Sequence, residues 1–190
     1  MDNPLKPRKP SVARIAAEYI FEAIGEDTFR EGLADTPARF QKAWEKWAEG
    51  YTQDPATFMT SFEEGAYDEM VLVKDIPIYS KCEHHLADIF GTATIAYIPD
   101  GRVLGLSKLS RVANVFARRL QVQERLTVQI ANALFESELK PKGVGVLLKC
   151  RHMCMESRGI CQQGHHTVTS ALRGVMKEGD PRAEFLKLAA

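Results

Sequence analysis

Cysteine and histidine stand together at two places in the sequence, at spacings that suit a metal ion. Cys82 and His85 are separated by Glu83 and His84, so a thiolate and an imidazole could bind one zinc ion from a tight turn. One such pair is weak evidence alone, because a buried cysteine near a solvated histidine gives the same pattern. A second group of ligands is therefore needed before the turn predicts a metal site.

His152 and Cys154 form that second group, in a segment expected to be a strand. A spacing of two places both side chains on one face of a strand, so a single cleft could use both. If Cys82, His85 and Cys154 bind zinc, the fourth tetrahedral position is left for water, which is the arrangement of a catalytic site. His84 and His152 would then remain free to transfer protons.

A closed structural zinc site is the alternative, and it needs a fourth protein ligand. On a strand, Cys150 would lie roughly 13 Å from Cys154, too far to share an ion whose bonds to sulfur are about 2.3 Å. Reach does not exclude Cys161, so this alternative stays open. The adjacent His165 and His166 are expected in a solvated loop rather than among the ligands.

The composition limits the classes of protein to consider. A chain of 190 residues, 45% of them hydrophobic, suits one globular domain. Because 25 basic residues balance 25 acidic ones, no overall field favours nucleic acid or an anionic membrane surface, and an anionic ligand needs a local cluster. No apolar run approaches the ~18 residues that argue for a membrane span. Residues 1–10, rich in proline and basic residues, are expected to be a flexible tail, and the protein is expected in the cytoplasm with reduced cysteines.

Hydrophobic periodicity divides the remaining residues, 11–190, into a helical part at 11–60 and a mixed core at 70–190. Helices are predicted from Ser11 to Gly25 and from Thr36 to Gly50, the second with a proline just after its cap. The turn at residues 99–101 predicts an antiparallel hairpin between 89–98 and 103–106. Further strands are expected at 70–79, 144–156 and 167–172, and further helices at 109–116, at 122–134 and from Asp180 onward.

This order of elements predicts an α+β domain, with helices packed on one face of an antiparallel sheet. The N-terminal helices would precede that core. Cys82 and His85 would lie in the connection between two strands, and His152 and Cys154 on a long strand.

Four blocks of the sequence together resemble the GTP cyclohydrolase I family. The resemblance extends from the helix at Thr36 to Phe185 and Leu186, and four blocks in the right order are much stronger than any one. Leu120 and Ser110 depart from the usual proline and asparagine, but neither supplies the chemistry. Residues 161–166 are the least family-like segment. The blocks are Ser80–His85, Gly105–Arg111, Val122–Thr127, and His152–Cys154 followed by Arg158 and Gly159.

The resemblance implies the tunnelling fold and a homodecamer of two pentamers, with active sites between subunits. It implies zinc-dependent hydrolysis of GTP at carbon 8, release of formate and rearrangement to 7,8-dihydroneopterin triphosphate, the first step of tetrahydrofolate and pterin biosynthesis. Cys82, His85 and Cys154 would be the zinc ligands. The implied catalytic residues are His84, His152 and Ser107, and the implied substrate-binding residues are Gln123, Glu124, Lys108, Arg111, Arg158 and, from a neighbouring subunit, Lys42 and Arg39.

The chemistry of these residue types agrees with the implied roles. The carboxylate of Glu124 could accept hydrogen bonds from two adjacent donors of guanine, whereas adenine would leave a buried mismatch. His152 is placed to protonate nitrogen 7 of the purine. Lys108, Arg111 and Arg158 offer cationic donors to a triphosphate, and Ser107 at a predicted helix start adds free backbone amides. The neighbouring arginines Arg118 and Arg119 suit a solvated basic face and receive no role.

Two other functions remain as alternatives. A nitrile reductase of the same fold would use a cysteine nucleophile and a nicotinamide cofactor, which makes His85 and Cys154 unnecessary as zinc ligands. A non-catalytic, zinc-stabilised scaffold would keep its function when His84 and His152 are replaced by alanine.

Overall fold

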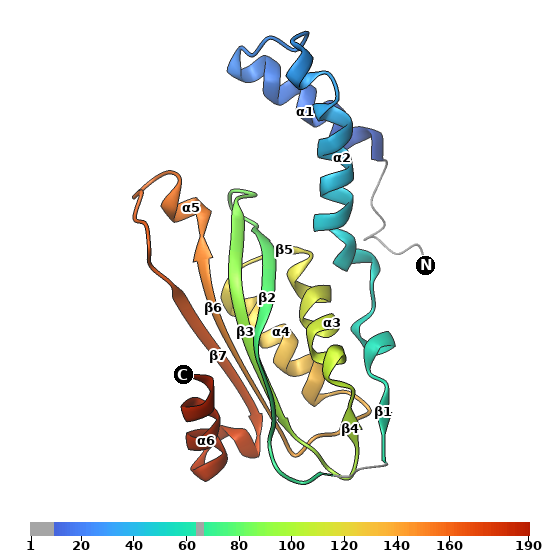
Figure 1. The fold of residues 1–190 in the computed structure, drawn as a ribbon, viewed down its shortest axis with the longest axis vertical. Coiled ribbons are helices and arrows are strands. Elements are labelled where there is room, and N and C mark those ends of the chain that lie inside the picture. The colour runs from blue at the N-terminus through green and yellow to red at the C-terminus, as the bar shows by residue number, and fades with distance from the viewer. Residues whose placement is uncertain (1–9, 64–66) are drawn as a thin grey trace.

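Two N-terminal helices project from a core built on one sheet (Figure 1). The structure, a computed structural model, describes residues 10–63 and 67–190, so the predicted tail lies outside it except for Pro10. Helix α1 covers Pro10–Ile24 and packs against α2, Thr36–Trp47, which begins at its threonine and proline as predicted. Three short 3-10 turns connect these helices with one another and with the core, η1 at Glu31–Leu33, η2 at Glu49–Thr52 and η3 at Pro55–Phe58.

The sheet has five strands in the order β5-β2-β3-β6-β7. The four long strands are antiparallel to their neighbours, as predicted, whereas β5 runs parallel to the end of β2, so the sheet is mixed. The α+β class is confirmed. The strands are β2 at Val71–Cys82, β3 at Asp88–Ile98, β5 at Leu120–Gln121, β6 at Gly143–His152 and β7 at Thr167–Gly174.

The predicted hairpin between residues 89–98 and 103–106 is wrong. Strand β4, Val103–Leu104, pairs instead with β1, Ser61–Phe62, in a separate two-stranded sheet. The reason is that β2 and β6 already occupy the two edges of β3. The chain therefore leaves the main sheet after the turn, and the backbone N–H of Leu104 donates to the hydroxyl of Tyr97 at 2.9 Å.

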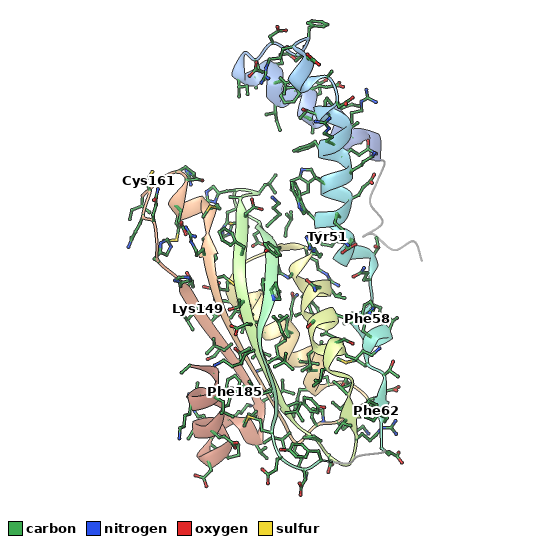
Figure 2. All side chains as sticks on the ribbon, viewed as in Figure 1. Tyr51, Phe58, Phe62, Lys149, Cys161 and Phe185 are labelled. Atoms are coloured by element: carbon green, nitrogen blue, oxygen red, sulfur yellow. The ribbon has the colours of Figure 1, made fainter. Side chains whose placement is uncertain are left out.

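Helices α3 and α4 cover one face of the sheet, as predicted. Alternate residues of the strands, such as Ile78, Ala93 and Val146, are fully buried beneath them. Helix α6 packs on the other face, where Phe185 joins a small second cluster (Figure 2). Within the described residues, no helix is both long and apolar enough to cross a membrane. The bounds are Leu106–Ala117 for α3, Gln123–Phe135 for α4, Val175–Lys177 for η4 and Gly179–Ala189 for α6.

The strand expected at 144–156 is shorter than predicted. It ends at His152, and Met153–Glu156 form a single helical turn, α5. The buried carboxylate of Glu156 makes a two-bond ion pair with Arg151, which joins the end of β6 to the end of this turn. Cys154 therefore lies on a helical turn, and the argument that it shares a strand face with His152 is wrong.

Candidate metal and catalytic centre

The turn between β2 and β3 holds two of the predicted ligands. The backbone N–H of Cys82 donates to the carbonyl of Ala87, and that of Leu86 donates to the carbonyl of Cys82, both at 2.8 Å. Leu86 has a φ of 56°, a left-handed conformation that costs a residue with a side chain roughly 1–2 kcal/mol. This tight turn brings Nδ1 of His85 to 3.9 Å from the sulfur of Cys82.

Helix α5 supplies the third ligand. The sulfurs of Cys82 and Cys154 and a ring nitrogen of His85 all lie within 4.8 Å of one another. Any two donor atoms of a tetrahedral zinc site with bonds of about 2.3 Å are roughly 3.8 Å apart. This donor set therefore fits zinc with small adjustments. Cys82 is buried, Cys154 is partly buried and His85 is exposed. The cluster is therefore open on one side.

The two remaining cysteines do not join this group. Cys150 is fully buried in the core, and burial raises the pKa of its thiol to about 12. Cys161 is exposed at the loop beyond α5, with its sulfur 3.6 Å from the carbonyl oxygen of Gly159 (Figure 2). The closed structural site that the sequence left open has no fourth cysteine ligand among the described residues.

The Cys154 thiol must lose its proton before it can bind a metal ion. Burial, and then the proximity of Cys82, raises the pKa of the Cys154 thiol above its ordinary value. Two thiolates this close repel each other, and a divalent cation between them removes the repulsion. A metal ion therefore competes with a proton for the sulfur of Cys154.

Arg158 lies at the edge of the same cluster. Its Nη1 lies 3.0 Å from Nε2 of His85, while Nδ1 of that ring faces Cys82. Arg158 is itself exposed. The structure thus brings one predicted substrate-binding cation directly to the candidate metal centre.

His152 is held by Gln123, the first residue of α4. The ring Nε2 of His152 lies 2.7 Å from Oε1 of Gln123, and the amide nitrogen of Gln123 donates to the carbonyl of Thr167 and the hydroxyl of Thr169. Gln123 was predicted to bind substrate, but in this structure its amide is committed to these contacts. Burial lowers the pKa of His152, and the negative charge of Glu124 partly opposes this effect.

His84 projects from the turn toward solvent, with 63% of its side chain exposed. Its Nε2 lies 3.8 Å from a carboxylate oxygen of Glu83. Glu83 in turn forms an ion pair with Arg125 of α4, which also donates to the side chain of Gln121. Neither Glu83 nor Arg125 was predicted to have a role, although both stand beside predicted site residues in two of the four sequence blocks.

The other predicted substrate residues lie elsewhere in the chain. Helix α3, which carries Ser107, Lys108 and Arg111, begins beside β4, at the opposite end of the core from α5 and the β2–β3 turn (Figure 1). Lys42 and Arg39 are exposed on α2, where Arg39 pairs with Asp35. One chain therefore does not bring these residues to the candidate metal centre.

The two adjacent histidines of the last loop differ from each other. His166 is exposed, as predicted for a solvated loop. Both ring nitrogens of His165 are buried and have no hydrogen-bond partner among the described residues. Neither histidine belongs to the cluster of Cys82, His85 and Cys154.

Comparison with known proteins adds independent information. A family model described as GTP cyclohydrolase I matches residues 13–190. A GTP cyclohydrolase 1 from Nitrosospira multiformis is 56% identical, over 90% of this chain and 91% of the relative. Proteins with the same description from Janthinobacterium and Aquifex aeolicus are 57% and 55% identical, over 87% and 91% of this chain and 85% and 92% of their own. Among solved structures, the archaeosine synthase QueF-Like in the apo form has a TM-score of 0.41 and 19% identity, over 55% of this chain and 93% of its own.

Proposed function

This chain belongs to the GTP cyclohydrolase I family, and from that premise we propose that it hydrolyses GTP at carbon 8, releases formate and forms 7,8-dihydroneopterin triphosphate. The family predicted from the four sequence blocks is confirmed. The observation that carries the proposal is the cluster of two thiols and one imidazole within 4.8 Å, with His152 anchored two residues from Cys154.

Zinc is the metal that we propose for this cluster. Two cysteines and one histidine form a donor set typical of zinc, and the open side leaves a position for water. When bound, zinc supplies the chemistry that makes water a nucleophile near neutral pH. Cys82 and Cys154 would hold the metal as thiolates and His85 would hold it as a neutral imidazole.

His152 is proposed to move the proton at nitrogen 7 of guanine. Because the oxygen of Gln123 accepts from Nε2, that nitrogen carries a hydrogen, and Nδ1 remains available to the substrate. The lowered pKa keeps the free ring neutral near pH 7, so protonation of the ring would accompany binding of the anionic substrate. Gln123 therefore acts as a residue that sets the tautomer of His152.

His84 is proposed as the second acid or base, for opening the imidazole ring and hydrolysing the formamide. Its exposure leaves it accessible to substrate, and its neighbour Glu83 is fixed to α4 through Arg125. A positioned acid or base typically contributes ~10²–10⁴-fold in rate. Ser107 would lie near the sugar during the later rearrangement, as the family resemblance implies.

The substrate would be held by residues of more than one subunit. We propose that Glu124 selects guanine and that Arg158, together with Lys108, Arg111, Lys42 and Arg39, binds the triphosphate. Since α3 begins at the opposite end of the core from the metal cluster, those of its residues that complete the site come from a neighbouring chain. We therefore propose a homo-oligomer, a decamer of two pentamers by family resemblance, which works in the cytoplasm at the start of pterin and tetrahydrofolate biosynthesis.

A single assay tests this function. Zinc-loaded protein is incubated with GTP, and formate and the pterin that fluoresces after oxidation are quantified together. The proposal predicts equal amounts of the two products, and little of either from protein whose zinc has been removed by a chelator. Zinc-loaded protein that consumes no GTP would contradict the proposal, and nicotinamide oxidation without zinc would favour the nitrile reductase.

A further inference from the structure

Lys81, the residue before Cys82, has an unusual environment for a lysine. Only 10% of its side chain is exposed. Its amine lies 2.5 Å from a carboxylate oxygen of Asp88 and 3.7 Å from the ring centroid of Trp47. A buried ammonium is stable only when it is paired, and the aspartate and the face of the indole ring provide this pairing. The two partners come from different parts of the fold.

Asp88 lies directly across the sheet from Lys81. The two residues face each other as the last pair between β2 and β3 before the turn that carries Cys82 and His85. Their ion pair therefore closes the base of that turn. The turn contains Leu86 in a left-handed conformation, and a strained conformation persists only where surrounding contacts fix it. The Lys81–Asp88 pair is one such contact.

Trp47 is the last residue of α2 and stacks edge-on against Trp44, whose ring centroid lies 5.6 Å away. Lys81 thus connects the metal-binding turn with the end of the helix that carries Lys42. A cleft lined by Trp47, Tyr79, Ser80, Lys81, Asp88 and Arg118 lies at this junction. The Lys81 amine therefore contacts both the metal-binding turn, through Asp88, and the end of α2, through Trp47. No strand pairing connects these two segments.

We propose that Lys81 is a positioning residue for the metal centre, which holds the Cys82–His85 turn closed at its base and against the end of α2. The inference rests on the proposed zinc site. Groups that hydrogen-bond to metal ligands typically contribute 10- to 100-fold to metal affinity, and Lys81, which acts through the backbone of the turn, is expected at the lower end of that range. Replacement of Lys81 should accordingly weaken zinc binding without removing a ligand.

Zinc affinity, measured in the whole protein by competition with a chromophoric chelator and without GTP, tests the inference. Lys81→Met should bind zinc about 10-fold more weakly than the wild type, and Lys81→Arg should restore the affinity to within about twofold. Lys149→Met is the matched control, because Lys149 is an exposed lysine on β6, away from the turn (Figure 2), and its affinity should equal the wild type's. The two tryptophans of the sequence are Trp44 and Trp47, so Lys81→Met should also change the tryptophan emission spectrum.

Unchanged zinc affinity in Lys81→Met, even with a lower melting temperature, would show a merely structural role and overturn the inference. If that variant fails to fold, Asp88→Asn decides, because 58% of the Asp88 side chain is exposed and the same loss of affinity is expected. Failure of the wild type to release formate from GTP would instead remove the proposed function, and the zinc measurements would be unaffected by it.

Discussion

The side-chain oxygen of Gln123 lies 2.7 Å from Nε2 of His152, and the rest of the Gln123 amide fixes this contact. The amide nitrogen donates to the backbone carbonyls of Thr167 and Leu148, so exchanging the oxygen and nitrogen positions would place an oxygen against two acceptors. The family resemblance implies that Gln123 binds the substrate, whereas its side chain here contacts the proposed catalytic residue His152. We propose that Gln123 orients that histidine and sets its tautomer.

Gln123→Leu should lower kcat about 10- to 100-fold, because His152 would lose the contact that orients its ring. Zinc content should stay at the wild-type level, since Gln123 contacts no metal ligand. Thr169→Val removes one of the contacts of the amide and leaves the oxygen in place, so its effect should be smaller. The measurement is formate release in a single turnover. Equal rates in the wild type and Gln123→Leu would contradict the orienting role.

His84→Ala and His152→Ala should each reduce formate release by ~10²–10⁴-fold while the protein retains its zinc. His166→Ala, which removes an exposed histidine of the last loop, is the control and should have wild-type activity. Zinc content by metal analysis and formate release are measured on the same samples. Full formate release from both site variants would contradict the proposed catalytic roles of His84 and His152.

Subunits that lack different parts of the site should complement each other. Helix α3, which carries Arg111, begins at the opposite end of the core from the end of β6, where His152 lies, and we propose that one active site takes these two residues from two chains. His152→Ala and Arg111→Ala proteins, each of low activity, should on refolding together regain roughly a quarter of wild-type activity, because one site in four then has both residues intact. Mixed samples no more active than their components would contradict the shared site.

Acid should destabilise the protein partly through Glu156. The Arg151 guanidinium holds the pKa of the Glu156 carboxyl below its ordinary value. A carboxylate whose pKa is lower in the folded than in the unfolded state stabilises the fold above the unfolded value, about 4.3, and loses this contribution as the pH falls through the folded value.

Glu156→Gln should therefore show a flatter dependence of the unfolding free energy on pH below about 5 than the wild type. Urea unfolding of the zinc-free protein at several pH values measures this dependence. Glu184→Gln, at an exposed position of α6, should follow the wild-type curve. If Glu156→Gln also follows the wild-type curve, the ion pair does not contribute to the pH dependence of the unfolding free energy.

The four cysteines should differ in reactivity. Cys161 is exposed, whereas burial raises the pKa of Cys150 to about 12, so its thiol should stay unreactive near neutral pH. Alkylation of zinc-loaded native protein should therefore label Cys161 alone, and Cys154 should be labelled in addition after zinc is removed. Peptide mass spectrometry identifies the sites. Labelling of Cys154 at the same rate with and without zinc would argue against its role as a ligand.

The sequence predicted the strongly patterned parts of this fold well. The spacing of apolar residues located the helices. The separation of Cys82 and His85 in the sequence is enough to predict that a tight turn lets both bind one metal ion. The pairing of β4 was not predictable from the turn before it, because that pairing depends on which strands take the edges of β3. The residues around the turn do not indicate which strands will pair with β3.

The meeting of Cys154 with Cys82 and His85 was predicted for a partly wrong reason. The residues do come together, but through a helical turn that the Arg151–Glu156 ion pair stabilises rather than through the face of a strand. The contacts of Lys81 with Trp47 and of Gln123 with His152 join segments far apart in the chain. Such contacts depend on the assembled fold, so no local pattern of residues shows them.

Zinc-edge X-ray absorption on the wild-type protein counts the ligands of the metal ion. We predict two sulfur ligands at about 2.3 Å, one nitrogen at about 2.0–2.1 Å and one oxygen from water, and the loss of one sulfur in Cys154→Ser. A spectrum with three sulfurs, or with four protein ligands and no water, would contradict it.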